Sequence, residues 1–117
     1  MKRTIVVILR RAPYGRVHVP EGMRAARGVA AGFDRHDVTV LFAQDGVYGA
    51  RGRVDREALN LPGHIADLHA EDGRMVVDRA SMDARDVAET EIADDIAVLD
   101  GAAVSKLITD ADHTLDF

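Results

Sequence analysis

The feature that most constrains the fold is the continuous apolar run from Thr4 to Leu9, which is rich in β-branched residues. The run is too short for a core helix, and it is bounded by Arg10-Arg11 and by the turn formers Pro13 and Gly15. A short apolar run without alternating polar residues is typical of a strand buried on both faces, and such strands occur mainly in parallel sheets. The sequence therefore predicts a parallel sheet that is covered by helices on both sides.

The rest of the chain repeats this order of strand and helix. Further strands are predicted at 37–43, 75–77, 96–99 and 114–117, and helices at 20–33, 58–68, 81–87 and 101–111, with Pro62-Gly63 expected to break or kink the second helix. Ser81 and Asp100 are the expected N-caps of the last two helices. The expected architecture is α/β: one domain over residues 1–117, with a mostly parallel five-stranded sheet and helices on both faces.

Composition excludes several classes of protein. The chain has no cysteine, so disulfides, thiolate metal sites and cysteine nucleophiles are ruled out for these 117 residues. We expect a cytoplasmic protein, because the N-terminus does not fit a signal peptide and no apolar run approaches ~18 residues. Direct nucleic-acid binding is not expected, because the net charge is -5 and only 4% of residues are aromatic.

The charges are segregated along the chain. Residues 1–56 contain eleven Lys and Arg against five acidic residues, whereas residues 57–117 contain four against fifteen. Such an asymmetry suits subunit pairing or anion binding. The alternative is that it reflects only a general preference of the source organism for Arg over Lys and for Asp over Glu.

The candidate site lies beyond the carboxyl ends of the strands, where open α/β sheets bind ligands. It consists of the loops Arg10–Val19 and Gln44–Arg56 and the turn Asp78–Ser81. These loops carry arginines that would form a basic mouth for carboxylate, phosphate or sulfur oxyanions if they converge. The predicted anion- or partner-binding residues are Arg10, Arg11, Tyr14, Arg16, Asp45, Tyr48, Arg51, Arg53, Ser81 and Arg85, with Arg56 in the same mouth. The alternative is that these arginines are solvated or pair with acids of a neighbouring subunit.

Other chemistries find little support. The first turn matches neither a dinucleotide fingerprint nor a P-loop, so we expect no nucleotide or other cofactor. The five histidines are scattered along the chain, so we expect no metal site. No serine has a nucleophile-elbow context, so a hydrolytic triad is not supported. Asp45 and Asp78 both follow strands and are candidates for acid–base work, although aspartate at a strand end is also ordinary turn chemistry.

Four segments, in order along the chain, resemble the DsrE/DsrF-like (TusD/TusC-like) sulfur-relay family. The start is similar in its opening strand, its turn Ala12-Pro13-Tyr14-Gly15 and its helix from Glu21-Gly22-Met23, and the segment 41–48 resembles the family's strand and "ADGV" motif. The segment 77–87 resembles the "AAS-L-x-x-R-G" helix, with Asp86 in place of the usual Gly, and 111–117 resembles the closing "aD-x-x-x-x-F" strand.

The resemblance implies a Rossmann-like domain that forms trimers, or hexamers with paralogues, and relays sulfur as a protein persulfide toward thiolated tRNA or within sulfur oxidation. In DsrE/TusD-like members the sulfur-carrying Cys ends the third main strand, and the matching position here is Asp78. A carboxylate cannot form a persulfide and repels an incoming thiolate. The chain is thus expected to be of the non-carrier DsrF/TusC type.

Three functions follow as hypotheses. The first is a non-catalytic subunit of a sulfur-relay complex, partnered with a Cys-bearing DsrE-like paralogue and possibly with an acidic sulfur-carrier protein. The second is a homo-oligomeric module that binds a small anion or nucleotide, and the third is a small-molecule enzyme that uses Asp45 and Asp78.

Overall fold

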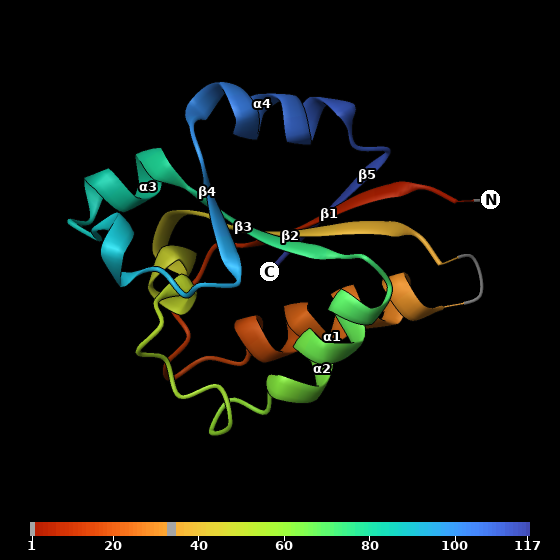
Figure 1. The fold of residues 1–117 in the computed structure, drawn as a ribbon, viewed down its shortest axis with the longest axis horizontal. Helices are drawn as coiled ribbons and strands as arrows, with labels where there is room; N and C mark the ends of the chain where they lie inside the picture. The colour runs from red at the N-terminus through yellow and green to blue at the C-terminus, as the bar shows by residue number, and fades with distance from the viewer. Residues whose placement is uncertain (1, 33–34) are drawn as a thin grey trace.

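Five parallel strands form one sheet in the order β4-β3-β2-β1-β5 in the computed structural model, which describes residues 2–32 and 35–117 (Figure 1). The strands are β1 (Thr4–Leu9), β2 (Asp37–Phe42), β3 (Arg74–Asp78), β4 (Ile96–Leu99) and β5 (His113–Asp116). All four strand pairings are parallel, as the apolar run at the N-terminus predicts. The α/β class and the Rossmann-like arrangement are confirmed.

The strand β1 is buried on both faces. It lies between β2 and β5, and each of its residues from Thr4 to Leu9 is in register with a residue of β2. Val6 and Val7, which point to opposite faces of the sheet, are both fully buried. The β-branched run therefore occupies the most shielded part of the sheet, where its side chains stabilise the packing on both sides.

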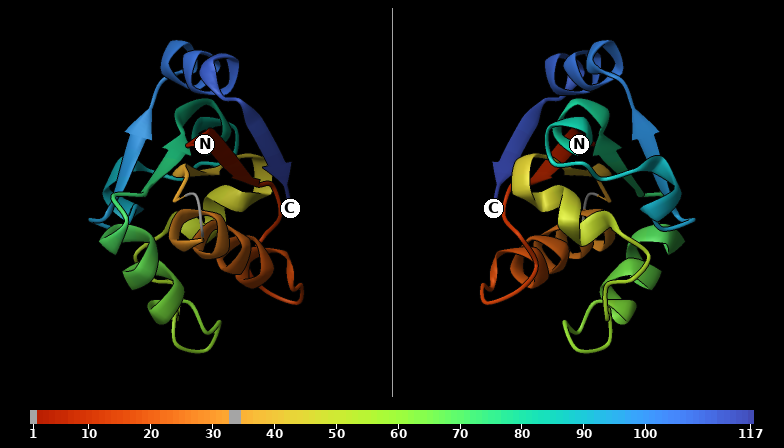
Figure 2. Two further views of the ribbon diagram at one scale, coloured as in Figure 1. Left: turned by 90° about the vertical axis from the view of Figure 1, so that its right-hand side faces the viewer. Right: turned by 90° about the vertical axis from the view of Figure 1, so that its left-hand side faces the viewer.

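The two faces of the sheet are covered unequally. Helices α1 (His18–Ala31) and α2 (Pro62–Ala70) pack together below one face, and α4 (Gly101–Asp110) lies alone above the other (Figures 1 and 2). The larger core includes Val7, Leu9 and Phe42, and the smaller core under α4 is built on Val6, Ile8 and Leu41.

Two of the predicted segments differ in the structure. The second helix begins at Pro62 and continues to Ala70, rather than running from residue 58 with a break, because proline is well accommodated in the first turn, where its missing N–H costs nothing. The polar segment after β2 begins with a 3-10 helix, η1 (Gln44–Ala50), which periodicity did not reveal. The predicted helical position Phe33 lies outside the described residues.

The helix η1 is held close to the end of β1. The amide of Ala43 donates to the carbonyl oxygen of Leu9 at 3.0 Å, and a Cβ atom at Gly46 would overlap that same carbonyl group. A side chain at Gly46 would therefore push η1 away from the sheet, so glycine is required here by the close approach of two backbone segments.

No helix among the described residues is long and apolar enough to cross a membrane.

Substitution of Gly46 by Ala tests this close approach. We expect Gly46→Ala to lower the free energy of unfolding by about 1–3 kcal/mol, because the added methyl group must displace backbone. The matched control is Gly28→Ala in α1, where nothing lies within 4 Å of the added atom and the helix should gain roughly 0.5–1 kcal/mol. Urea melts of both variants measure the difference, and equal stability of the two would contradict the assignment.

Candidate functional site at the carboxyl ends of the strands

The carboxyl ends of the five strands meet at one edge because the sheet is entirely parallel. Three segments follow there: the loop 10–17 after β1, η1 after β2, and the short helix α3 (Arg79–Ala84) after β3. The first two are in contact, since a Cβ atom at Gly49 would lie 3.8 Å from Cβ of Pro13. The predicted location of the site at this edge therefore corresponds to a real meeting of loops.

Asp78 caps α3 and fixes Ser81. Its Oδ2 atom accepts a hydrogen bond from the Ser81 hydroxyl at 2.6 Å and one from the Ser81 amide at 3.3 Å. The prediction that Ser81 is the N-cap is wrong, because the strand delivers Asp78 in an extended conformation (φ -79°, ψ 115°) from which its carboxylate reaches the amide three residues on.

Ser81 also joins α3 to the end of β2. Its Oγ atom accepts a hydrogen bond from the amide of Gln44 at 2.9 Å, and Gln44 has a left-handed backbone with φ 52°. The Ser81 hydroxyl therefore donates to Asp78 at the end of β3 and accepts from Gln44, which follows β2. Ser81 is 8% exposed, so both bonds satisfy a side chain that has little access to water.

A second contact between the same elements is formed by Arg85. Its Nε atom donates to Oδ1 of Asp45 at 2.8 Å, and one terminal nitrogen donates to the carbonyl oxygen of Ser81 at 3.4 Å. We call Gln44, Asp45, Asp78, Ser81 and Arg85 the strand-end cluster. The structure thus brings four predicted site residues together, namely Asp45, Asp78, Ser81 and Arg85.

The contacts within the strand-end cluster define what it can do chemically. Asp45 is paired with Arg85 and Asp78 with Ser81, so each carboxylate has its own partner rather than sharing a proton with the other. The Ser81 hydroxyl hydrogen is directed to Asp78. The arrangement is that of a stabilising hydrogen-bond network that closes the ends of two strands.

The remaining predicted cations divide into separate groups. Arg10 donates from Nε to Asp116 at 2.7 Å, which links the ends of β1 and β5. Arg51 lies over the Tyr48 ring, 5.1 Å from its centroid, and donates to the Tyr48 carbonyl oxygen at 3.0 Å. The guanidinium groups of Arg10 and Arg51 therefore already have contacts within the protein.

The loop after β1 contains exposed predicted residues. Tyr14 is 54% exposed and its neighbour on the loop, Val17, is 68% exposed, and Gly15 between them has φ 70°. Arg11 and Arg16 on the same loop are exposed and form no ion pair with any described residue. We call the segment 11–17 the basic loop.

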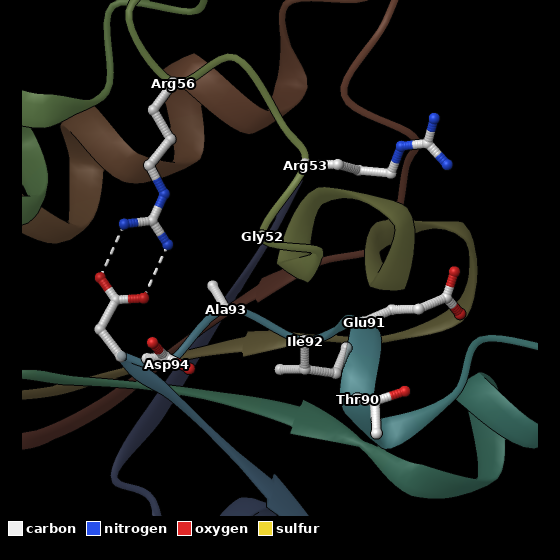
Figure 3. A pocket seen from close by; sticks show the side chains of 9 residues that line it. Gly52, Arg53, Arg56, Thr90, Glu91, Ile92, Ala93 and Asp94 are labelled. Carbon is white, nitrogen blue, oxygen red and sulfur yellow. Dashed lines mark hydrogen bonds and ion pairs between the residues drawn. The ribbon is translucent and has the colours of Figure 1, made fainter.

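A broad groove lies on the other side of η1 (Figure 3). It has a volume of about 1000 Å³ and is lined by Gly52, Arg53, Arg56 and the segment Thr90–Asp95, which includes the end of the 3-10 helix η2 (Glu89–Glu91). Its floor is a short antiparallel bridge between Arg51 and Ile92. Arg53 is exposed and is one of the residues that line this groove.

The groove is closed at one end by an ion pair. Both terminal nitrogens of Arg56 donate to the Asp95 carboxylate at 2.7 Å (Figure 3). These hydrogen bonds lower the pKa of Asp95 below its ordinary value of 3.8, against the opposing effect of partial burial, and they raise the pKa of Arg56. The pair joins the loop after η1 to the start of β4.

Sequence reasoning missed Ile92 and Asp95. Asp95 is 39 residues from Arg56, and no spacing rule connects two loops so far apart. Gln44 was expected as the first residue of the loop Gln44–Arg56, but the hydrogen bond from its backbone amide to Ser81 was not predicted. No group of three or more His, Asp or Glu residues suited to a metal ion occurs in residues 2–32 and 35–117.

Comparison with known proteins decides the family. The model of the DsrE/DsrF-like family matches residues 3–117. The chain belongs to the DsrE/DsrF-like family. It is also similar to the intracellular sulfur oxidation protein DsrF of Allochromatium vinosum, with 29% identity over 126 aligned residues that cover 92% of this chain and 91% of that protein.

Solved structures with the same fold extend this result. The YchN protein from E. coli superimposes over the full length of both chains with a TM-score of 0.79 at 20% identity. A protein of unknown function from Methanobacterium thermoautotrophicum superimposes over the full length of both chains with a TM-score of 0.73 at 13% identity. At these identities the two structures establish the DsrE/DsrF-like fold of the chain and nothing more.

The structure explains the one departure from the family pattern noted after α3. Asp86 occupies the position where the resemblance leads us to expect glycine, and it has a left-handed backbone with φ 53°. Glycine adopts this conformation without strain, and aspartate tolerates it better than most residues. The turn geometry is thus consistent with a glycine at this position.

Removal of the Asp78 cap tests the strand-end cluster. We expect Asp78→Ala to lower the free energy of unfolding by about 1–2 kcal/mol, because the Ser81 amide and hydroxyl both lose their acceptor. Asp78→Asn is the control, because its amide oxygen still accepts, and it should lose less than half as much. Thermal or urea melts provide the measurement, and equal losses would show that charge rather than capping is the source of stability.

The Asp95–Arg56 pair predicts a specific acid sensitivity. Because Asp95 has a lower pKa in the folded protein than in the unfolded chain, the pair stabilises fully above about pH 4 and is lost as the pH falls through the folded pKa. Asp95→Asn should therefore cost about 0.5–1 kcal/mol at neutral pH and progressively less below about pH 4.

Urea melts across the acid range measure this dependence. Asp94→Asn is the matched control, because Asp94 forms no ion pair among the described residues, and it should track the parent protein at every pH. A difference between Asp95→Asn and the parent that stays constant down to about pH 2 would contradict the assignment.

Proposed function

We propose that this chain is a non-carrier subunit of a sulfur-relay complex, in which a Cys-bearing DsrE-like paralogue holds the persulfide. Membership of the DsrE/DsrF-like family and the similarity to the sulfur oxidation protein DsrF support the sulfur-relay context. The name of that relative favours sulfur oxidation over tRNA thiolation as the process served. The proposed location is the cytoplasm, because persulfide transfer by the partner needs reduced thiols.

The observation that carries the proposal is the chemistry at the end of β3. The position where the family resemblance expects the sulfur-carrying Cys holds Asp78, and the sequence has no cysteine elsewhere. The Asp78 carboxylate is bound to Ser81 as a helix cap rather than directed to an incoming substrate. A side chain so engaged supports the shape of this edge and does not carry sulfur.

The basic loop is the proposed contact for the partner. Exposed Tyr14 and Val17 offer apolar surface, and Arg11 and Arg16 are free of ion pairs within the described residues. Aromatic and arginine side chains of this kind dominate the binding energy of many interfaces. The proposed assembly is a trimer or hexamer that contains this loop at a subunit or carrier interface, where its charge attracts an acidic protein.

The rival hypotheses have less support. A small-anion module needs converging free arginines, yet Arg10, Arg51, Arg56 and Arg85 are engaged by Asp116, Tyr48, Asp95 and Asp45. An enzyme that uses two aspartates needs carboxylates that contact each other or are free to contact a substrate. Here the Asp45 carboxylate is bound by Arg85 and the Asp78 carboxylate by Ser81.

Reconstitution tests the proposal. This chain and a Cys-bearing DsrE-like protein from the same genome are mixed with a persulfide donor, separated by size-exclusion chromatography with light scattering, and weighed by intact mass spectrometry. We expect a joint complex in which added sulfur is found on the partner only. Sulfur bound covalently to this chain, or no association with any such partner, would refute the proposal.

Variants of the same complex test the docking surface. Tyr14→Ala combined with Arg16→Glu should weaken the complex at least roughly tenfold, because it removes an aromatic anchor and reverses a charge. Ile108→Ser is the matched control, since Ile108 is the exposed apolar residue on α4, which covers the other face of the sheet. Loss of the complex in the Ile108 variant alone would move the interface away from the basic loop.

A further inference from the structure

A second hollow lies beneath α4, on the face of the sheet that this helix covers, and runs from the amino ends of β1 and β3 toward the carboxyl end of β4. It has a volume of about 280 Å³ and is lined by Thr4, Arg74, Leu99, Ala103, Lys106, Leu107 and Asp110. Thr4 and Arg74 are the first residues of β1 and β3. Leu99 is the last residue of β4 and is in register with Asp78, so the hollow extends from the amino edge along the α4 face toward the carboxyl end of β4.

The hollow exists because α4 covers its face of the sheet incompletely. No residue of α4 is buried, whereas five residues of α1 are buried against the other face. Ala103 contributes only a methyl group where α4 approaches the sheet edge. A larger side chain at this position would fill the space, so the small residue leaves it open.

The apolar part of the lining comes from Leu99, Ala103 and Leu107. Leu99 and Leu107 are half-buried and pack at the margin of the smaller core. Ala103, Lys106, Leu107 and Asp110 stand at positions i, i+3, i+4 and i+7, which places them along one face of α4. The sheet contributes the opposite wall, because Thr4 and Arg74 precede the buried residues Val6 and Val76 by two positions and so face α4 as well.

The mouth of the hollow has a net positive charge. Arg74 is exposed and forms no ion pair with any residue in the described ranges. Lys106 pairs with Asp110 at 2.7 Å, but both side chains are well exposed, and such a pair within one helix is weak and readily exchanged. One guanidinium group is thus available beside a small space that is partly lined by apolar side chains.

We propose that this hollow binds a small amphipathic monoanion, such as a short alkyl or aryl carboxylate. The hydrocarbon part lies between Leu99 and Leu107 over Ala103, and the carboxylate accepts hydrogen bonds from Arg74. The volume accommodates a chain of several carbons and excludes a nucleotide. Open α/β sheets ordinarily bind ligands beyond the carboxyl ends of their strands, whereas the carboxylate-binding Arg74 lies at the amino end of β3, so this proposal does not depend on the proposed relay function.

Titration with sodium hexanoate tests the proposal. Methyl resonances of Leu99, Ala103 and Leu107 should shift in a saturable way, while those of Val17 and Val47 at the other edge stay in place. Acetate, which lacks the apolar tail, and 1-hexanol, which lacks the charge, should each bind at least roughly tenfold more weakly. Inorganic phosphate should not shift these methyl groups.

Variants separate the two halves of the site. Arg74→Gln should weaken hexanoate binding roughly tenfold, and Ala103→Leu should abolish it by filling the hollow. Arg11→Gln and Ala102→Leu are the matched controls, because Arg11 lies on the basic loop and Ala102 is an exposed neighbour on α4 that does not line the hollow. Binding that survives Ala103→Leu in a folded protein, or equal affinity for hexanoate and acetate, would overturn the proposal.

Discussion

The parallel pairing of β1 with β2 is the constraint on which the rest of the structure depends. Each residue from Thr4 to Leu9 is in register with a residue of β2, and the run is buried on both faces. A strand of this kind cannot lie at a wet surface, so helices must cover both sides. Parallel strands also need long crossovers, which is why a helix or 3-10 segment separates each strand from the next. All carboxyl ends then meet at one edge.

The chemistry of that edge is a closed network of hydrogen bonds. Asp78, Ser81 and Gln44 satisfy one another between the ends of β2 and β3, and Arg85 joins Asp45 to the same turn. Buried and half-buried polar groups are stable only when they are hydrogen-bonded. Here those hydrogen bonds engage the Asp45 and Asp78 carboxylates, which are the groups that acid–base catalysis would need. The proposal that this chain is a non-carrier subunit rests on this pairing of the polar groups at the edge.

The two faces of the sheet show how unequal covering creates room for a ligand. The face under α1 and α2 holds the larger core, and η1 and α3 extend it toward the carboxyl edge. The other face depends on α4 alone, none of whose residues is buried. Close packing of one short helix against five strands is not possible over their whole width, so a hollow lined by apolar and charged residues remains beneath α4.

Local signals in the sequence determined much of the fold. The apolar run predicted β1 with its observed bounds, and Asp100 was expected to cap α4 and does so through the Ala103 amide at 2.8 Å. These features depend on neighbours a few residues away, where propensity and capping rules operate. The location of the candidate site followed in the same way, because the ends of parallel strands must meet.

The tertiary structure alone decided which side chains meet. Arg56 finds Asp95 and Arg10 finds Asp116 across 39 and 106 residues, and these pairings divide the expected basic mouth into separate groups. That Asp78 rather than Ser81 caps α3 depends on the extended geometry with which β3 ends. Long-range contacts follow from strand order and loop path, which local patterns do not encode, so the sequence by itself determined the layers of this protein while packing determined the partners of its charges.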